Sequence, residues 1–449
     1  MITITEILKV LSLELSGTNL RILIEICKGI FRLTGKVTGL NISRYTDKVG
    51  SYRNLQRFFS EKINWKKIKI ILFEKFLYDE TDTYVIASDE CTEDKSGKST
   101  YGINRFFSSI VGKVIPGIAF LHFSLISLSH RDSYSIDVEQ IIKEKKKLAT
   151  TNSKKKQKNK KKKKGRPKGS KNKNKSEIKY HSLLRLSEKM LSNLKKEHDK
   201  FLTKMRVQHF VGDGAYGNNN WVLLLEKYDL KLISKLHYNA ALYSAYTGAY
   251  CGHGRPKKYG KRINIDNISS SYLVKSIDEK ENNYIEYIYQ LEVLSKNFRD
   301  RLNVVIIIRK DRETGKMKNV ILFSNDLELS AEKIIDIYSL RFQIEFNFRD
   351  AKQFFGLSDF KNIKEKQVKN AINLSLFMTL ISKILLQKYR DFFNNEKLSI
   401  NDLKSLFRAD MYISKILKND NENTLAFFNS NTHLKEILTI GLINRKLAS

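Results

Sequence analysis

The chain has 449 residues, of which 82 are Lys or Arg and 48 are Asp or Glu, so its formal net charge is +34. This length exceeds one ordinary hydrophobic core and predicts about two to four domains. A hydrophobic content of 41% excludes a chain too polar to fold. So large a positive charge predicts a polyanionic partner, and nucleic acid is the usual one.

Three cysteines in a chain of this length argue against a disulfide scaffold and for a reducing compartment. The N-terminal residues MITITEILKV lack a basic head followed by an apolar run, so we expect no signal peptide. The most apolar stretches, 114–128 and 374–386, are short and are interrupted by His122 and Lys383, which predicts no membrane span. We therefore expect a soluble, cytoplasmic protein.

Residues 1 to about 80 have the apolar periodicity of short helices. The clearest is Asn19–Leu33, and two shorter helical patterns flank Gly50. Their apolar residues would face inward, while Arg53 and Arg57 would face outward. A helix-turn-helix that reads DNA fits this pattern, and so does a small helical bundle with a basic surface.

Two short apolar runs, each followed by a carboxylate, predict central strands of an α/β domain. The first is Tyr84–Ser88, followed by Asp89, and the second is His209–Val211, followed by Asp213. Gly214 would permit a sharp turn after the second carboxylate. Because α/β proteins build their sites at the carboxyl ends of core strands, Asp89 and Asp213 are candidate site residues.

A low-complexity basic segment interrupts this domain at about residues 140–177. Its Lys154–Lys175 stretch holds thirteen Lys, one Arg and no acidic residue, so it cannot pack a core. Within it, a Gly-Arg-Pro-Lys sequence containing Arg166 and Lys168 resembles an AT-hook, whose Arg enters a narrow minor groove. A second such sequence contains Arg255. Both are equally consistent with non-specific tethers to phosphate.

From about residue 237 to 327 helical periodicity gives way to strand-like runs, which predicts a β-rich insertion large enough to be a subdomain. Six tyrosines among its Lys and Arg residues suit stacking on displaced DNA bases, although tyrosine is also common in ordinary strands. They are Tyr238, Tyr243, Tyr246, Tyr250, Tyr259 and Tyr272. Residues 366–449 read as helical again, with a long apolar helix at about 367–389.

Between these two regions we expect one helix, from about Ser330 to Phe355. With 100° per residue, a narrow polar stripe flanks its apolar face. The polar stripe consists of Tyr338, Arg341, Glu345, Arg349 and Lys352. Such a stripe could hold a metal ligand beside an anionic substrate, or Glu345 could simply pair with cations one turn away.

Asp89, Asp213 and Glu345 together form the candidate catalytic set. Three carboxylates brought to one edge of a sheet can hold two divalent cations, which stabilise the attacking and leaving oxygens of a phosphoryl displacement. Hard oxygen ligands favour Mg²⁺, with Mn²⁺ as a substitute. The sequence therefore predicts metal-dependent phosphoryl transfer.

The polar stripe resembles the Tyr-Arg-Glu-Lys signature of DDE transposases of bacterial insertion sequences, of the insertion-sequence-four kind. Ser88–Glu90 and Val211–Tyr216 are similar to the first and second Asp motifs of that family. The resemblance covers roughly residues 50–360.

This resemblance implies an α/β fold with a ribonuclease-H-like core, a β-rich insertion, and helical N-terminal and C-terminal regions. A helical domain that binds DNA ends would occupy residues 1–80, and the catalytic core residues 81–236 and 328–365. The insertion at 237–327 would fall between the second Asp and the Glu, as in that family. Residues 366–449 would form the C-terminal region.

The resemblance also implies a mechanism. The three carboxylates would bind two Mg²⁺ while water cleaves the phosphodiester at a transposon end, and the freed 3′-OH would attack target DNA. Tyr338, Arg341 and Lys352 would hold the terminal 5′ phosphate. Such proteins act as homodimers that bridge two inverted-repeat ends of double-stranded DNA, here in the bacterial nucleoid.

Two other functions are open at this level. One is a nuclease or resolvase with a ribonuclease-H fold that transfers no strand. The other is a non-catalytic protein that binds AT-rich DNA through the basic segment and the two hook-like sequences.

Overall fold

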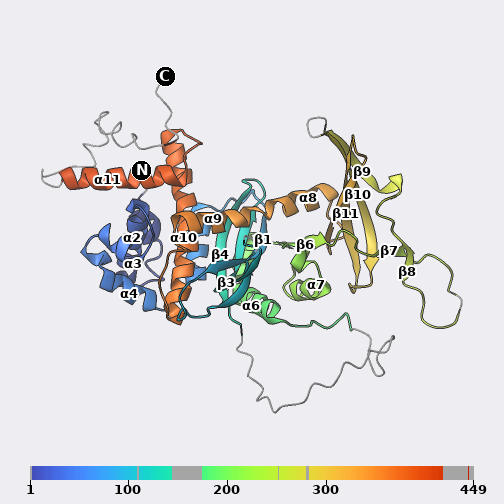
Figure 1. Cartoon of the computed structure of the whole chain (residues 1–449), viewed down its shortest axis with the longest axis horizontal. Helices are drawn as coiled ribbons and strands as arrows, with labels where there is room; N and C mark the ends of the chain where they lie inside the picture. Colours follow the sequence, from blue (N-terminus) through green and yellow to red (C-terminus); the bar gives the residue numbers. More distant parts are fainter. Residues whose placement is uncertain are drawn as a thin grey trace, which may run out of the picture. The chain divides into compact units, whose positions relative to one another are not determined.

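A computed structural model gives the fold of the chain (Figure 1). It describes residues 3–108, 111–143, 174–250, 252–279, 283–417 and 443. The chain forms two compact units. The first comprises residues 1–140, 193–211 and 337–449, and the second comprises residues 141–192 and 212–336. The four-part division expected from the sequence stays a prediction.

The first unit begins with short helices, as the apolar periodicity predicts. They are α1 (Ile4–Lys9), α2 (Gly17–Arg32), α3 (Gly39–Arg44), α4 (Tyr52–Ser60) and α5 (Trp65–Phe76), with a 3₁₀ turn at Lys48–Gly50. On α4, Leu55, Phe58 and Phe59 are buried. Arg53 and Arg57 are exposed on the opposite side, as expected. This layout fits both a helix-turn-helix and a bundle with a basic face.

The long helix α10 (Glu365–Phe393) is the centre of the helical part of the first unit. It packs against α4 and α5, and in Figure 1 it stands between the N-terminal helices and the sheet strands. Trp65 Nε1 donates to Asn370 Oδ1 at 2.8 Å, which bonds α5 to α10. The last helix, α11 (Ile400–Leu417), packs on α2 and α10.

By length and composition, α10 is also the one helix in the described ranges that could cross a membrane. However, 83% of its most apolar window is buried within the protein. Burial of this kind is typical of a core helix, which is apolar on all sides because protein surrounds it.

The sheet of the first unit has the strand order β2-β3-β1-β5, with β4 also paired to β3. The strands are β1 (Tyr84–Asp94), β2 (Asn104–Ser108), β3 (Lys113–Ser127), β4 (Asp132–Ile141) and β5 (His209–Val211). The strand predicted to end at Ser88 continues to Asp94, because β3 pairs antiparallel with β1 over that whole length. Asp89 therefore lies inside a strand and not at its end, which corrects the prediction.

The helix predicted from Ser330 to Phe355 is two helices, α8 (Ala331–Leu340) and α9 (Gln343–Phe354). At the break, the N–H groups of Phe342, Ile344 and Glu345 bond to carbonyls three residues earlier. This spacing winds the backbone more tightly than the four-residue spacing of an α-helix. A wheel with uniform 100° steps does not represent such a break, so the polar stripe is not continuous. α9 packs against β1, β3 and α10.

The second unit is rich in β-structure, as predicted. Its strand order is β6-β12-β11-β10-β7-β8, with β9 paired to β10. The strands are β6 (Lys231–Leu236), β7 (Leu242–Ala245), β8 (Tyr259–Arg262), β9 (Leu273–Glu279), β10 (Tyr284–Ser295), β11 (Arg301–Asp311) and β12 (Met317–Ser324). The helices that precede them in the chain are α6 (Ser182–Lys204) and α7 (Asn219–Glu226). Val304–Ile306 of β11 is fully buried, so the core of this unit lies at the middle of its sheet.

Candidate active site

One face of β1 carries a line of ionisable side chains. Because side chains alternate across a strand, Asp89, Cys91 and Glu93 share a face. The Asp89 side chain is 22% exposed, whereas that of Glu93 is 6% exposed. Cys91 is a buried free thiol, and burial raises its pKa. Asp89 is thus reachable from solvent, and Glu93 lies deep in the unit.

α9 covers this face and brings Glu345 to its Asp89 end. Glu345 lies in the first turn of α9, where the helix dipole favours a negative charge. Arg341, at the break between α8 and α9, contacts both carboxylates. Its Nη1 is 3.7 Å from Asp89 Oδ2, and its Nη2 is 3.3 Å from Glu345 Oε1. One guanidinium therefore joins a strand carboxylate to a helix carboxylate.

A second ion pair anchors the far end of α9 to the same strand. Lys352 Nζ lies 2.5 Å from Glu93 Oε1, and the Ser358 hydroxyl donates to Glu93 Oε2 at 2.7 Å. Burial by itself lowers the pKa of Lys352, but the neighbouring Cys91 and Glu93 outweigh it and raise that pKa overall. Lys352 is thus a charged, half-buried group held by the buried carboxylate of Glu93.

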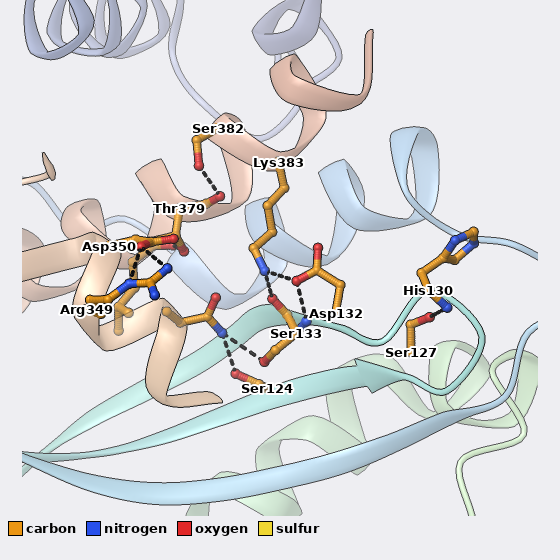
Figure 2. Close-up of polar contacts among 12 residues, drawn as sticks. Ser124, Ser127, His130, Asp132, Ser133, Arg349, Asp350, Thr379, Ser382 and Lys383 are labelled. Carbon is orange, nitrogen blue, oxygen red and sulfur yellow. Dashed lines mark hydrogen bonds and ion pairs between the residues drawn. The ribbon is translucent and has the colours of Figure 1, made fainter. Parts of the chain in front are cut away.

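A buried polar network lies under α9. Asn347 is fully buried, and its Nδ2 donates to Ser124 Oγ at 3.1 Å and to Ser133 Oγ at 2.9 Å. Figure 2 shows Lys383 reaching from α10 to the same strand end, where it pairs with Asp132 and donates to the Ser133 carbonyl at 2.5 Å. Both α9 and α10 are therefore bonded to the start of β4.

His122 belongs to this buried network and lies opposite Asp89 in the register of β1 and β3. Its Nε2 is 2.9 Å from Ser135 Oγ. Burial, followed by the charges of Lys69 and Lys383, holds the pKa of His122 well below its usual value. The imidazole is therefore neutral and serves as part of the sheet interior.

Asp213 follows the short strand β5, which runs parallel to β1. In the register of these strands Ala87 lies beside Val211. Asp213 belongs to the second unit, where its Oδ1 accepts a hydrogen bond from the Ala215 N–H at 2.9 Å.

Gly212 and Gly217, and not Gly214, are the glycines that this turn requires, since a Cβ at Gly217 would lie 2.3 Å from the Lys235 carbonyl oxygen. A Cβ at Gly212 would lie 2.4 Å from the ring of Tyr216, which is buried and packs on Trp221 with ring centroids 4.3 Å apart. A Cβ at Gly214 would come no closer than 3.7 Å to the Lys235 carbonyl oxygen, which is an ordinary contact. This corrects the prediction that Gly214 permits the turn.

The other residues predicted to contact DNA lie outside the Asp89–Arg341–Glu345 cluster or outside the described residues. Tyr338 is half-buried on α8, and Arg255 is exposed on the loop between β7 and β8. Arg166 and Lys168 lie outside the described residues. Of the predicted site residues, the structure thus gathers Asp89, Arg341 and Glu345 into one cluster.

The donor set of this cluster fits a hard divalent cation. Asp89 and Glu345 supply carboxylate oxygens, the ligands that Mg²⁺ and Mn²⁺ prefer, and they already share one positive group, the Arg341 guanidinium. Within the described ranges, no group of three or more His, Cys, Asp or Glu side chains is arranged to hold a metal ion.

Sequence reasoning missed Glu93 and Asn347. Glu93 shares the face of Asp89 four residues along the strand, and Lys352 follows Glu345 by two helical turns. These two spacings are similar in length, about 13 Å on a strand and about 10 Å on a helix. If α9 is assumed to lie along β1 with Glu345 near Asp89, these similar lengths predict that Lys352 lies near Glu93. Asn347 gives no such signal, because its hydroxyl partners lie on strands more than 200 residues away in sequence.

Comparison with known proteins identifies a family. The sequence profile of the family described as DDE superfamily endonuclease matches residues 20–285. This match covers more than half of the chain, includes Asp89 and Asp213, and ends before Glu345. No curated protein matches the chain in a sequence comparison.

Proposed function

The chain belongs to the DDE endonuclease superfamily, and we propose that within it the protein acts as a transposase of a bacterial insertion sequence. It would bind the ends of the element, cut them, and join the freed 3′-OH to target DNA. The observation that carries the proposal is the Asp89–Arg341–Glu345 cluster. It sets two carboxylates and a guanidinium, a group able to bind phosphate, at one place on a mixed α/β unit, whose core we propose to be ribonuclease-H-like.

Asp89, Asp213 and Glu345 would hold two divalent cations, Mg²⁺ or Mn²⁺. Asp213 is included as the third carboxylate because its motif in the sequence is similar to the second Asp motif of insertion-sequence transposases. When bound, the cations supply positive charge to the attacking and leaving oxygens of the phosphodiester.

Arg341 has a distinct role in this proposal. Its planar guanidinium can bind a phosphate through two parallel hydrogen bonds, and it is only 17% exposed beside both carboxylates. A half-buried arginine next to acidic ligands suits a residue that orients the DNA end, with Tyr338 one helical turn earlier on α8. We propose that these two residues hold the terminal 5′ phosphate.

The second unit would supply a further DNA surface. No acidic residue occurs between Asp229 and Asp266, a stretch that contains seven Lys or Arg residues. Tyr238 on this stretch is 61% exposed, and the β7–β8 loop displays Arg255. Exposed tyrosines among cations suit contacts to bases and phosphates. We propose that Arg255, together with Arg166 and Lys168 of the basic segment, binds DNA outside the catalytic cluster.

The proposal includes the assembly and location inferred from the sequence. A homodimer would bridge the two inverted-repeat ends of one element, with the helical N-terminal part of each chain bound to an end. The protein would work in the bacterial cytoplasm on nucleoid DNA.

The test is cleavage of a labelled duplex that carries the inverted repeat flanking the coding region. Asp89→Asn, Asp213→Asn and Glu345→Gln should each lower Mg²⁺-dependent cleavage at least about a hundredfold, while binding of the uncut duplex changes little. Glu365→Gln is the matched control, because its carboxylate is an exposed partner of Lys369 on α10. Full cleavage by any one of the three site variants would refute the proposed catalytic set.

A second candidate function is a nuclease or resolvase that transfers no strand. The cluster supports both, since hydrolysis and strand transfer need the same carboxylates. Incubation of pre-cut ends with a supercoiled target separates the two, because only a transposase joins the labelled 3′ end to the target.

A further inference from the structure

The ion pair between Lys352 and Glu93 has the features of a fixed structural contact. Glu93 is nearly inaccessible, and both of its carboxylate oxygens are engaged, one by Lys352 at 2.5 Å and the other by the Ser358 hydroxyl at 2.7 Å. Lys352 also lies beside the buried Cys91 thiol. A buried carboxylate that lost this cation would be left without charge compensation, which is strongly unfavourable.

A neighbouring contact strengthens the same junction. Lys95, the residue that follows the end of β1, donates to the carbonyls of Ser358 and Phe360 at 3.0 and 3.2 Å. Its ammonium also lies 3.7 Å from the centroid of the Phe360 ring. The buried Lys95 thus joins the end of β1 to the segment that follows α9, next to the ion pair that joins β1 to α9 itself.

This junction controls where Glu345 lies. α9 is a rigid helix, with Lys352 near its end and Glu345 in its first turn. A shift of α9 by one residue along its axis would move Glu345 by about 1.5 Å and turn it by about 100°. Because Lys352 is tied to Glu93 on the strand that carries Asp89, such a shift would break the ion pair.

We propose that Lys352 is a positioning residue, which fixes the register of α9 on β1 through Glu93 so that Glu345 faces Asp89. This inference rests on the proposed function, and it differs from the role expected from the sequence, in which Lys352 contacts the DNA phosphate. The two roles differ in what Lys352 touches, so they give opposite results when its charge is exchanged with that of Glu93.

The experiment exchanges the two charges. Lys352→Glu alone should lower end cleavage at least about thirtyfold, and Glu93→Lys alone should do the same. The double variant Lys352→Glu/Glu93→Lys should recover cleavage to within about fivefold of the unaltered protein. If Lys352 touches phosphate, the double variant places a carboxylate against DNA and stays as inactive as Lys352→Glu, which would overturn the proposal.

A neutral double variant tests the same contact without placing a lysine at the buried position of Glu93. Lys352→Gln/Glu93→Gln keeps hydrogen-bonding groups on both sides and should cleave better than either single glutamine variant. The salt dependence of end binding gives an independent reading, because each phosphate contact contributes about 0.9 to the slope of log K against log salt. Lys352→Gln should leave that slope unchanged, and a decrease of about one would overturn the proposal.

Thermal unfolding tests the ion pair without DNA. The loss of Tm in Lys352→Gln/Glu93→Gln should be smaller than the sum of the losses in the two single variants, as expected for residues in direct contact. The matched control is Glu365→Gln/Lys369→Gln, an exposed ion pair on α10 at 2.7 Å, where single losses should be small and additive.

The two proposals can fail separately. If the unaltered protein does not cleave, the proposed function fails, and the unfolding measurement still reports on the ion pair. If it cleaves but the pair shows additive Tm losses and no recovery in the double variants, the positioning role is refuted and the proposed function stands.

Discussion

Substitution of Asn347 by Leu tests how firmly the buried network holds α9 to the sheet. Leu has nearly the shape of Asn but has no polar atoms, so the change removes the two hydrogen bonds to Ser124 and Ser133. It leaves both hydroxyls in a buried place with fewer partners. It also removes the Asn347 Oδ1 atom, which is buried and has no hydrogen-bond partner among the described residues.

The expected magnitude follows from these opposing effects. Two bonds between neutral groups are worth about 1 kcal/mol each, and a poorly satisfied buried hydroxyl adds a cost of similar size. Removal of the unpaired amide oxygen returns about 1 kcal/mol. We therefore expect Asn347→Leu to reduce the free energy of unfolding by about 1–2 kcal/mol, which corresponds to a Tm lower by a few degrees.

The assay is thermal unfolding of three variants beside the unaltered protein. Gln353→Leu is the control, since Gln353 lies on the exposed face of the same helix, and its effect should stay within about 0.5 kcal/mol. In Asn347→Leu/Ser124→Ala/Ser133→Ala, Asn347 and both of its hydroxyl partners are replaced by apolar side chains, so most of the lost stability should return. An unchanged or higher Tm for Asn347→Leu, or a triple variant less stable than the single one, would refute this reasoning.

Two further predictions concern the glycines beside Asp213 and the buried lysine of α11. Gly212→Ala should destabilise the protein by about 1–3 kcal/mol and lower end cleavage, because its Cβ would press on the buried Tyr216 ring, whereas Gly214→Ala should be tolerated in the same unfolding and cleavage assays. Burial, and then the nearby Arg408, lowers the pKa of Lys404 from 10.5 to about 8. Between pH 8 and 10.5 the unfolded chain therefore binds a proton that the folded chain does not. Stability should rise with pH across that window by up to about 3 kcal/mol, and the rise should be absent in urea unfolding of Lys404→Met.

The sequence predicted the elements whose signal is local. The N-terminal helices, the long apolar helix α10 and the β-rich region of the second unit all follow from periodicity within a single segment. The candidate residues Asp89, Arg341 and Glu345 were also found in this way, since each stands beside a clear apolar pattern. These features need no knowledge of what the segment packs against.

The errors arose where a distant partner decides the outcome. β1 continues past Ser88 because β3 pairs with it, and apolar character in β1 alone does not reveal that neighbour. The crowding at Gly212 comes from the Tyr216 ring, which only the folded turn brings close. The ion pair between Lys352 and Glu93, which the sequence did not suggest, joins residues 259 positions apart in the chain (352 − 93). The length of β1 and this ion pair depend on contacts between distant segments, and the crowding at Gly212 depends on the folded turn. Period and propensity encode neither.

The contacts of Arg341 bear on the two interpretations of the polar stripe. In one, Glu345 simply pairs with a cation one turn away, and in the other it is a metal ligand beside an anionic substrate. The Nη2 atom of Arg341 pairs with Glu345 one turn away, and its Nη1 atom pairs with Asp89 of the core strand β1. Arg341 lies between the two helices α8 and α9, and its Nε is buried and unpaired among the described residues. Its two terminal nitrogens contact different elements, one the strand β1 and the other the helix α9. The pairing and the proposed site are therefore the same contact, and the arginine that neutralises Glu345 is also the group that places it beside Asp89.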